Sequence, residues 1–459
     1  MSTLSAPASA IPANRATPHP HARFVVAAAA TLMMVCLGTI YSWSAYTQVL
    51  MAGFGWTNTQ VTGAIALGIF SVGLGAAVGG LWQDRVGPRI VALTGALMWG
   101  IGNVAAGLGT QSLGMAWLYA TYGLLGGFGV GMAYITPVAT VTKWFPYHKG
   151  LAGGIVATGF GAGAVFYSLT LQSVPTFNEA ASIAAAFLKS KGTTATLSAM
   201  QLSGVLDLLA WSGLLFGAAG GLCAMLLQNP STSAASQEPT AVPADDNSFT
   251  TIEMLRSRQF YVLWLMFFIN VTAGILLMSN AIPIIQGLTN EAPAVAASAF
   301  SIAAIFNALG RFFWGTLSDK LGRRAVFGLL FGFQALLFAV LGNLHDLVAV
   351  TAVVAAVLLC LGGGFGVMPS FNADYFGLKN VGANYGALLT AWGCAGVAGP
   401  MLAAEVSDLT GSYGNALMAI AGILTVALVL PVISRKPVKA ARLDETHEGV
   451  AEPALSSGD

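Results

Sequence analysis

The chain has 459 residues, of which 19 are Lys or Arg and 18 are Asp or Glu, so that 8% are charged, whereas a soluble chain carries about 25%. Hydrophobic residues make up 56%, which leaves too little polar side-chain surface to cover a soluble globule of this length. The net charge of +1 provides no basic field that would attract nucleic acid. The composition therefore excludes a soluble enzyme and indicates an integral membrane protein.

Stretches without charge divide the chain into expected membrane helices. Residues 24–83 and 90–142 contain no charged residue, and each stretch is long enough for two spans of about 20 residues, with turns expected at 55–58 and 109–112. Eight further stretches of low charge follow, at 150–178, 205–227, 259–285, 292–318, 325–345, 347–373, 384–405 and 411–434. The sequence lacks the alternating segments of about ten residues typical of outer-membrane barrels. We therefore predict an all-α integral membrane protein with twelve transmembrane helices.

The distribution of Lys and Arg predicts the orientation. With both termini in the cytoplasm, 16 of the 19 basic residues fall on the cytoplasmic side, whereas Lys189 and Lys191 lie in a long outer loop, 173–204. This loop is either an amphipathic cap over the outer mouth or an insertion. We expect a multi-pass protein of the inner (plasma) membrane with five parts: a disordered N-terminus (1–22), a six-helix bundle (23–227), a cytoplasmic linker (228–257), a second six-helix bundle (258–434) and a cytoplasmic tail (435–459).

A ten-residue motif follows the second expected span and occurs again after the eighth. Residues 80–89 and 315–324 both fit Gly-x-x-x-Asp-(Arg/Lys)-x-Gly-x-Arg, and corresponding positions lie 235 residues apart. Pro137 and Pro369 supply a second correspondence, at an offset of 232. Duplicated six-helix halves indicate a secondary transporter with two pseudo-symmetric bundles and a substrate site near the midplane between them.

This repeated loop motif resembles that of the major facilitator superfamily, and the resemblance covers the whole spanned region. It implies the major facilitator fold and alternating access, in which two bundles rock about a central site. It also implies that Asp84, Arg85 and Asp319 form a latch at the inner gate. The alternative is that these charges mark cytoplasmic turns and orient the chain.

Arg311 is the one charged residue deep inside an expected span. It lies eight residues before Asp319, roughly 12 Å along a helix, where the half-thickness of the hydrocarbon core is about 15 Å. An arginine at this depth costs at least about 2.5 kcal/mol and needs a partner or an aqueous cavity. No Asp or Glu lies at a similar depth, because Asp207 and Glu405 fall near the outer ends of their spans. We predict that Arg311 binds an anionic substrate; a buried ion pair or a bond to a backbone carbonyl is the alternative.

Three aromatic residues accompany Arg311. Tyr134 and Trp392 lie at a similar depth in spans 4 and 11, and Tyr41 lies in the second half of span 1. Tyrosine hydroxyls can donate hydrogen bonds to a carboxylate, and aromatic rings shape a small cavity without adding charge. We predict that these residues line the substrate site; ordinary helix packing or an interfacial belt is the alternative reading.

Four motifs in order along the chain resemble the oxalate:formate antiporter family, which is similar to carriers of lactate and pyruvate. They lie at 41–43, at 143–154, at 254–264 and at 376–377 with 384–386. In that family an arginine on span 8 and a lysine on span 11 together bind the doubly charged oxalate. The resemblance places the arginine at Arg311, but the lysine position holds Trp392.

The other site positions implied by the resemblance are partly retained. The tyrosines of spans 1 and 4 are present as Tyr41 and Tyr134, whereas two aromatic positions of span 10 have become Leu361 and Phe365. A dianion facing a single arginine would leave one charge uncompensated in a medium of low dielectric constant, whereas a monoanion would be neutralised. We therefore expect a carrier of a small monocarboxylate such as lactate, pyruvate or formate.

The sequence specifies less clearly whether substrate transport is coupled to protons or to a second substrate. No histidine lies inside an expected span, and no deep carboxylate can act as a proton relay. Proton-linked transport is favoured, with the substrate itself carrying the proton, while exchange and uniport remain open. The alternatives for the whole chain are an oxalate:formate-type antiporter and a membrane sensor built on a transporter scaffold. We expect no cofactor or metal and no nucleic-acid partner, and a monomer in the lipid bilayer.

Overall fold

The computed structural model describes residues 21–189, 197–230, 248–410 and 413–438, which form helices and short connections. Lys191, the N-terminus up to residue 20, the middle of the predicted linker and the tail from residue 439 lie outside the described residues. Most of the described helices are long and apolar. Their bounds follow the charge-free stretches of the sequence closely.

The first half of the chain contains the following elements. They are α1 (Ala22–Gly38), the 3-10 helix η1 (Thr39–Ser42), α2 (Trp43–Phe54), α3 (Asn58–Val86), α4 (Pro88–Leu118), the π-helix η2 (Tyr119–Gly126), α5 (Gly127–Trp144), α6 (Lys149–Ser173), α7 (Pro175–Lys189) and α8 (Ala199–Leu226). The segments α1, η1 and α2 form one continuous crossing.

The second half begins with a short helix inside the predicted linker. The elements are α10 (Thr251–Leu255), α11 (Arg258–Thr289), α12 (Pro293–Leu321), α13 (Arg323–Leu341), α14 (Leu347–Phe376), α15 (Val381–Thr410), α16 (Tyr413–Ala427) and α17 (Val429–Ile433). The last two form one crossing, because both lie within the apolar stretch that ends at Ile433.

The described helices account for twelve crossings. Ten stretches are long and apolar enough to span a bilayer, and one of them, Pro88–Trp144, has 57 residues and contains two crossings. The 30-residue helix α15 supplies the remaining one. The ten stretches, the second crossing within Pro88–Trp144 and α15 together give the predicted twelve transmembrane helices.

One predicted turn was misplaced. The turn at 55–58 is confirmed, since α2 ends at Phe54 and α3 begins at Asn58. The turn predicted at 109–112 is wrong, because α4 continues through these residues and the chain reverses at Gly114, which has a φ of +73°. Glycine adopts this backbone conformation without the steric cost that a side chain would bring. Thr110 is fully buried and packs as part of the helix, although its polarity suggested a loop.

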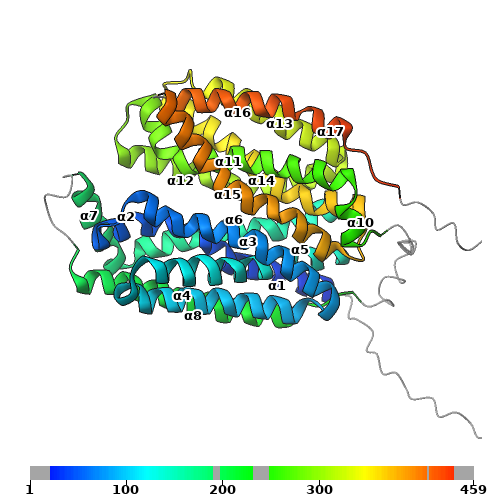
Figure 1. Cartoon of the computed structure of the whole chain (residues 1–459), viewed down its shortest axis with the longest axis horizontal. Coiled ribbons are helices and arrows are strands. Elements are labelled where there is room, and N and C mark those ends of the chain that lie inside the picture. Colours follow the sequence, from blue (N-terminus) through cyan, green and yellow to red (C-terminus); the bar gives the residue numbers. More distant parts are fainter. Residues whose placement is uncertain (1–20, 190–196, 231–247, 411–412, 439–459) are drawn as a thin grey trace, which may run out of the picture.

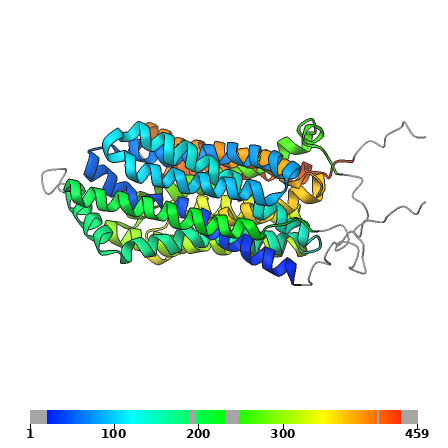
Figure 2. The same cartoon turned by 90° about the horizontal axis from the view of Figure 1, so that it is seen from below.

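The crossings form two bundles that lie side by side (Figure 1), one from the first half of the chain and one from the second. The described ends of the chain and α10 lie at one end of the long helices, and α7 lies at the other (Figures 1 and 2). We call these ends the terminus face and the α7 face. The bundles meet mainly where α3 packs on α15 and where α6 packs on α12.

Glycines allow this close approach on the terminus face. A Cβ atom added to Gly80 would lie 2.2 Å from the carbonyl oxygen of Gly382, and one added to Gly150 would lie 2.2 Å from that of Gly315. Real side chains do not tolerate such distances, so both contacts require backbone against backbone. The two contacts occupy equivalent places in the repeat, since Gly80 and Gly315 begin the two copies of the motif. The bundles are therefore packed together at this face.

The long loop 173–204 contains the amphipathic helix α7. Its buried side chains, Phe177 and Ala180 among them, pack on α2, α6 and α8 of the same bundle. The Phe177 ring centroid lies 5.4 Å from that of Tyr46, and Glu179 accepts a hydrogen bond of 2.9 Å from Gln201. The described part of this loop is thus folded onto the end of the first bundle.

Candidate functional site

Arg311 on α12 is fully buried between the two bundles. Its Nη1 donates a hydrogen bond of 3.1 Å to the carbonyl oxygen of Ala157 on α6. The guanidinium carbon lies 4.6 Å from the ring centroid of Phe365 on α14 and 5.3 Å from that of Phe160 on α6. These contacts stabilise a cation by its hydrogen bond and by the negative faces of two rings. No described residue forms an ion pair with Arg311.

A cluster of aromatic rings surrounds the guanidinium. Trp392 on α15 is also fully buried, and its ring centroid lies 5.0 Å from that of Phe365, 5.2 Å from that of Tyr134 and 5.8 Å from that of Phe160. Tyr41, which is only partly buried, contacts the rings of Phe160 and Trp392 at 5.3 and 6.2 Å. Helices from both bundles therefore build one aromatic cluster around one cation.

Several polar atoms in this cluster have no hydrogen-bond partner among the described residues. They include Nε and Nη2 of Arg311, Nε1 of Trp392 and the hydroxyls of Tyr134 and Tyr385. The Tyr134 ring centroid lies 5.2 Å from those of Trp392 and Phe160, and the Phe160 ring contacts the Arg311 guanidinium. Buried donors without partners are costly, so their convergence at one place indicates that another molecule can satisfy them.

The unpartnered atoms define the chemistry that this place can offer. Nε and Nη2 form one edge of the guanidinium, and a carboxylate accepts two parallel hydrogen bonds from such an edge. The neighbouring tyrosine hydroxyls and the indole N–H can donate further bonds to the same anion. The rings leave the rest of the site apolar. The arrangement suits a small anion with one carboxylate, and the described residues hold no cluster of His, Cys, Asp and Glu that could bind a metal ion.

The structure brings together five of the six predicted substrate-binding residues. Arg311, Tyr41, Tyr134, Trp392 and Phe365 are joined by the ring and cation contacts above. Leu361 lies one helical turn from Phe365 and packs against α11, where a Cβ added to Gly274 would lie 2.5 Å from its Cδ1.

Two further residues of the cluster were missed in the sequence. Phe160 contacts Arg311 and three of the aromatic rings, but in the sequence it is an apolar residue within a glycine-rich apolar stretch. Tyr385 lies seven residues before Trp392, which places it on the same side of α15, two turns nearer the terminus face. The heptad spacing was the available signal for Tyr385, whereas nothing in the local sequence distinguishes Phe160.

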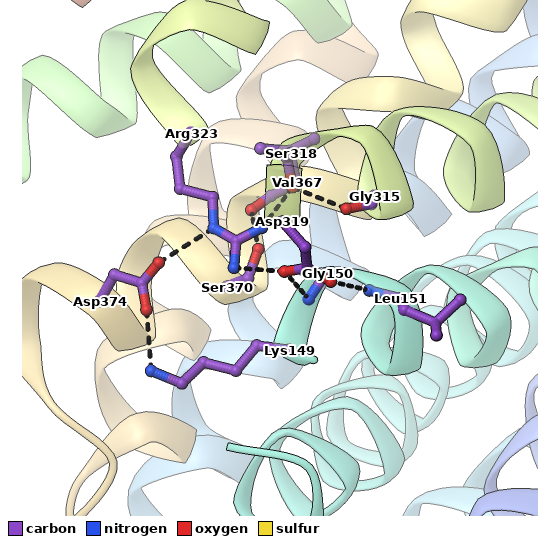
Figure 3. Close-up of polar contacts among 10 residues, drawn as sticks. All are labelled: Lys149, Gly150, Leu151, Gly315, Ser318, Asp319, Arg323, Val367, Ser370 and Asp374. Atoms are coloured by element: carbon purple, nitrogen blue, oxygen red, sulfur yellow. Dashed lines mark hydrogen bonds and ion pairs between the residues drawn. The ribbon is translucent and has the colours of Figure 1, made fainter. Parts of the chain in front are cut away.

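The second copy of the repeated motif joins the bundles on the terminus face (Figure 3). The carboxylate of Asp319, at the end of α12, accepts hydrogen bonds of 3.0 and 2.8 Å from the backbone N–H groups of Gly150 and Leu151, which begin α6. A carboxylate at a helix N-terminus satisfies free N–H groups and complements the helix dipole. Asp319 also pairs with Arg323 at 2.7 Å.

Arg323 extends this contact into a network, also visible in Figure 3. It pairs with Asp374 of α14 at 2.9 Å, and Asp374 accepts a second ion pair, of 2.8 Å, from Lys149 at the start of α6. Lys149 belongs to the first bundle, whereas Asp319, Arg323 and Asp374 belong to the second. The network therefore closes the gap between the bundles at this face by both charge and helix capping.

The first copy of the motif makes the corresponding contact with α15. Asp84, at the end of α3, accepts a hydrogen bond of 2.7 Å from the backbone N–H of Ala383 in the first turn of α15. Its other oxygen pairs with Lys143 of α5 at 3.1 Å. Arg85, which was predicted to act with these residues, is exposed, and its side chain makes no ion pair with a described residue.

The last arginine of each motif copy makes a contact that the sequence did not predict. Arg89 donates from Nε to the carbonyl oxygen of Leu227, at 3.0 Å, just after α8. Arg324 donates from Nε to the carbonyl oxygen of Pro431, at 2.9 Å, in α17. Each arginine thus binds the end of the last crossing in its own bundle, where free carbonyl groups accept hydrogen bonds.

Comparison with known proteins agrees with this architecture. The family model of the Major Facilitator Superfamily matches residues 28–288 and 263–456. An oxalate:formate antiporter of Oxalobacter formigenes is 30% identical over 423 residues, covering 91% of this chain and 93% of its own. Apicoplast pyruvate carrier 1 of Toxoplasma gondii is 30% identical over 416 residues, covering 80% and 74%. The crystal structure of the E. coli fucose:proton symporter FucP matches with a TM-score of 0.64 at 15% identity, covering 91% and 100%.

Proposed function

The chain belongs to the Major Facilitator Superfamily, and we propose that this membrane transporter carries a small monocarboxylate of the lactate, pyruvate or formate class by alternating access. The observation that carries the proposal is the state of Arg311. It is fully buried, lacks an ion-pair partner among the described residues and holds one edge of its guanidinium free. A carboxylate is the group that best satisfies that edge.

The number of charges in the site argues for a monoanion. Trp392 stands where the resemblance to oxalate:formate antiporters places a lysine, and no second cation contacts the aromatic cluster among the described residues. A monocarboxylate would make the site neutral, whereas a dianion would bury one uncompensated charge. The two relatives that align with most of this chain are named as an oxalate:formate antiporter and a pyruvate carrier. Both names are consistent with a carboxylate as substrate.

The closed face supports the cycle that we propose. Both motif copies cap helices of the opposite bundle on the terminus face, so substrate would reach Arg311 from the α7 face in this conformation. We assign the terminus face to the cytoplasm of a plasma-membrane protein, because basic residues cluster there. Transport would then require the Asp84 and Asp319 contacts to open, while the α7 face closes.

We also propose that transport is linked to protons through the substrate. Arg311 has no carboxylate or histidine within bonding distance among the described residues, so no side chain is available to pass a proton to the site. A monocarboxylate that binds Arg311 as the anion and takes up its proton directly from water, or one that exchanges for another monocarboxylate, needs no such relay. A pH gradient imposed without a counter-substrate distinguishes the two modes, because it accelerates proton-linked uptake and drives no net uptake by exchange.

Uptake into vesicles containing the purified protein tests these proposals. Labelled lactate, pyruvate, formate and oxalate should be compared with and without a pH gradient and with and without internal substrate. We expect saturable uptake of a monocarboxylate, accelerated by an inward proton gradient, and loss of uptake in Arg311→Gln. Arg89→Gln removes the same charge at the edge of the bundle and serves as the matched control. Preferential uptake of oxalate would favour the antiporter alternative and contradict the single-charge argument.

A further inference from the structure

The linker between the bundles is attached at both described ends, each time to the bundle that it joins. At its start, Trp144 of α5 donates from Nε1 to the carbonyl oxygen of Gln228, at 2.7 Å, and Arg89 binds Leu227 and Gln228. At its end, the backbone N–H of Phe249 donates to the carbonyl oxygen of Phe376, at 2.9 Å. Residues 229–247 lie between these two attachments.

The second attachment is the more extensive one. Asn380 and Asn384 both donate from their side-chain amides to the carbonyl oxygen of Phe249, at 2.9 and 3.1 Å. The Phe249 ring is buried and lies edge-on to Phe376, with the centroids 5.7 Å apart. The Ser248 hydroxyl accepts a bond of 3.3 Å from the backbone N–H of Lys379. Residues 248–249 thus hold both the end of α14 and the first turn of α15.

This same turn of α15 carries one of the contacts that close the terminus face. Ala383, which donates to Asp84 of the first bundle, lies between Asn380 and Asn384 in the sequence. The equivalent turn of α6 is held differently, because Asp319 caps two N–H groups there and Lys149 adds an ion pair. At α15 a single N–H group is capped, and the docked end of the linker supplies the additional support.

We propose that Phe249 is a positioning residue for the Asp84 contact: the docked linker end holds the first turn of α15 in place to meet Asp84 and thereby favours the conformation closed on the terminus face. The inference uses the proposed function for its transport readout only. Loss of the docking should shift the equilibrium between closed and open conformations, with or without substrate.

A distance measurement between spin labels tests this proposal directly. Ile90 and Ala325 are exposed, lie in the first turns of α4 and α13, and directly follow the two motif copies at corresponding positions, 235 residues apart. Both would be replaced by labelled cysteines after substitution of the four native cysteines. We expect the parent to show mainly the short distance. Phe249→Ala removes the buried ring, and the double variant Asn380→Ala/Asn384→Ala removes two amide donors. Each should lower the ratio of short to long distances by roughly tenfold, the scale of one or two buried hydrogen bonds or of part of a buried aromatic side chain.

Two controls separate docking from simple tethering. A protease site placed between residues 231 and 247 allows the linker to be cut while both attachments remain, and Trp144→Phe removes a bond at the other attachment only. Both should leave the distance ratio within about twofold of the parent, an amount below one hydrogen bond. An unchanged ratio in both the Phe249 and the double asparagine variants would overturn the proposal, as would a cut linker that reproduces their shift.

Transport provides a second readout that a general folding defect would not reproduce. If the open conformation gains population, KM measured from the terminus face should fall and KM measured from the α7 face should rise. A destabilised protein would instead lose activity from both sides. If none of the tested monocarboxylates is transported, the proposed function fails, whereas the distance ratios still decide the role of Phe249.

Discussion

Replacement of Arg311 by methionine should abolish carboxylate binding and leave the fold intact. Methionine keeps an unbranched side chain in the aromatic cluster but removes the N–H groups and the charge. Nε and Nη2 are free in the structure, so a bound carboxylate would gain two charge-assisted hydrogen bonds, each of about 1.5–3 kcal/mol. Their loss corresponds to roughly 10²- to 10⁴-fold weaker binding.

The stability of the unliganded protein should change far less. The substitution removes the bond to Ala157 and the contacts with the Phe160 and Phe365 rings, but it also removes the cost of a buried cation without a counter-ion. These terms oppose each other and are each of the order of a few kcal/mol. The expected signature is a nearly unchanged melting temperature together with the loss of its increase on adding substrate.

Calorimetric binding and thermal melting of the purified protein, each with lactate, pyruvate, formate and oxalate, measure both quantities. Arg311→Lys is the informative intermediate, because it keeps the charge but loses the planar edge that matches a carboxylate. It should bind more weakly than the parent and more strongly than Arg311→Met. Binding of Arg311→Met within threefold of the parent would show that the carboxylate is held elsewhere, and the single-charge argument for the substrate would fall with it.

Three further substitutions test separate parts of the structure. Trp392→Lys adds a second cation next to the site and should weaken monocarboxylate transport while admitting oxalate; uptake indistinguishable from the parent would mean that position 392 does not face the substrate. Asp319→Asn weakens the cap on α6 and should expose residues between the bundles to alkylation from the terminus face, whereas equal labelling of variant and parent would argue against a closing role. Gly150→Ala places a Cβ 2.2 Å from the carbonyl oxygen of Gly315, whereas Gly153→Ala meets nothing within 4 Å. Only the first should impair closure, by about 1–3 kcal/mol, measured as slower transport; equal rates in both would refute the packing argument.

The fold could be predicted from the sequence because a bilayer separates charged from apolar residues so strictly. Nearly every interruption in the apolar stretches coincides with the end of a helix, and the twelve crossings follow. The turn at Gly114 escaped detection because both Gly109 and Gly114 lie in a run of small and polar residues. Which glycine takes the positive φ depends on how the helices pack, and Thr110 is buried by that packing.

The sequence predicted how deep the candidate site residues lie in the membrane, but not which neighbouring helix each side chain faces. The rise per residue places Arg311, Tyr134 and Trp392 at one level, and the structure brings them together. Residue spacing along a helix does not state which neighbouring helix a side chain faces. Leu361 accordingly lies against α11, one turn from the contacts made by Phe365. Phe160 went unnoticed because an apolar aromatic residue in an apolar span carries no signal until its neighbours are known.

The two closing contacts show most clearly what a repeat in sequence leaves undetermined. The aspartates at 84 and 319 cap equivalent helices, as their common motif suggests, but their basic partners come from different positions. Arg323 bridges two aspartates in the second bundle, whereas Pro88 occupies its equivalent position in the first, and Asp84 pairs directly with Lys143.

The charged groups at each contact have no net charge. Only the contact around Asp319 places opposite charges on different bundles. Asp84 and Lys143 both belong to the first bundle, so opening leaves their ion pair intact and breaks only the cap on α15. Opening at the other contact separates Lys149 from Asp374 as well as Asp319 from α6. Salt screens partly exposed pairs of this kind, so the contact at Asp319 should be the more sensitive to ionic strength. The contact at Asp84 depends instead on the position of the first turn of α15, which the docked end of the linker holds.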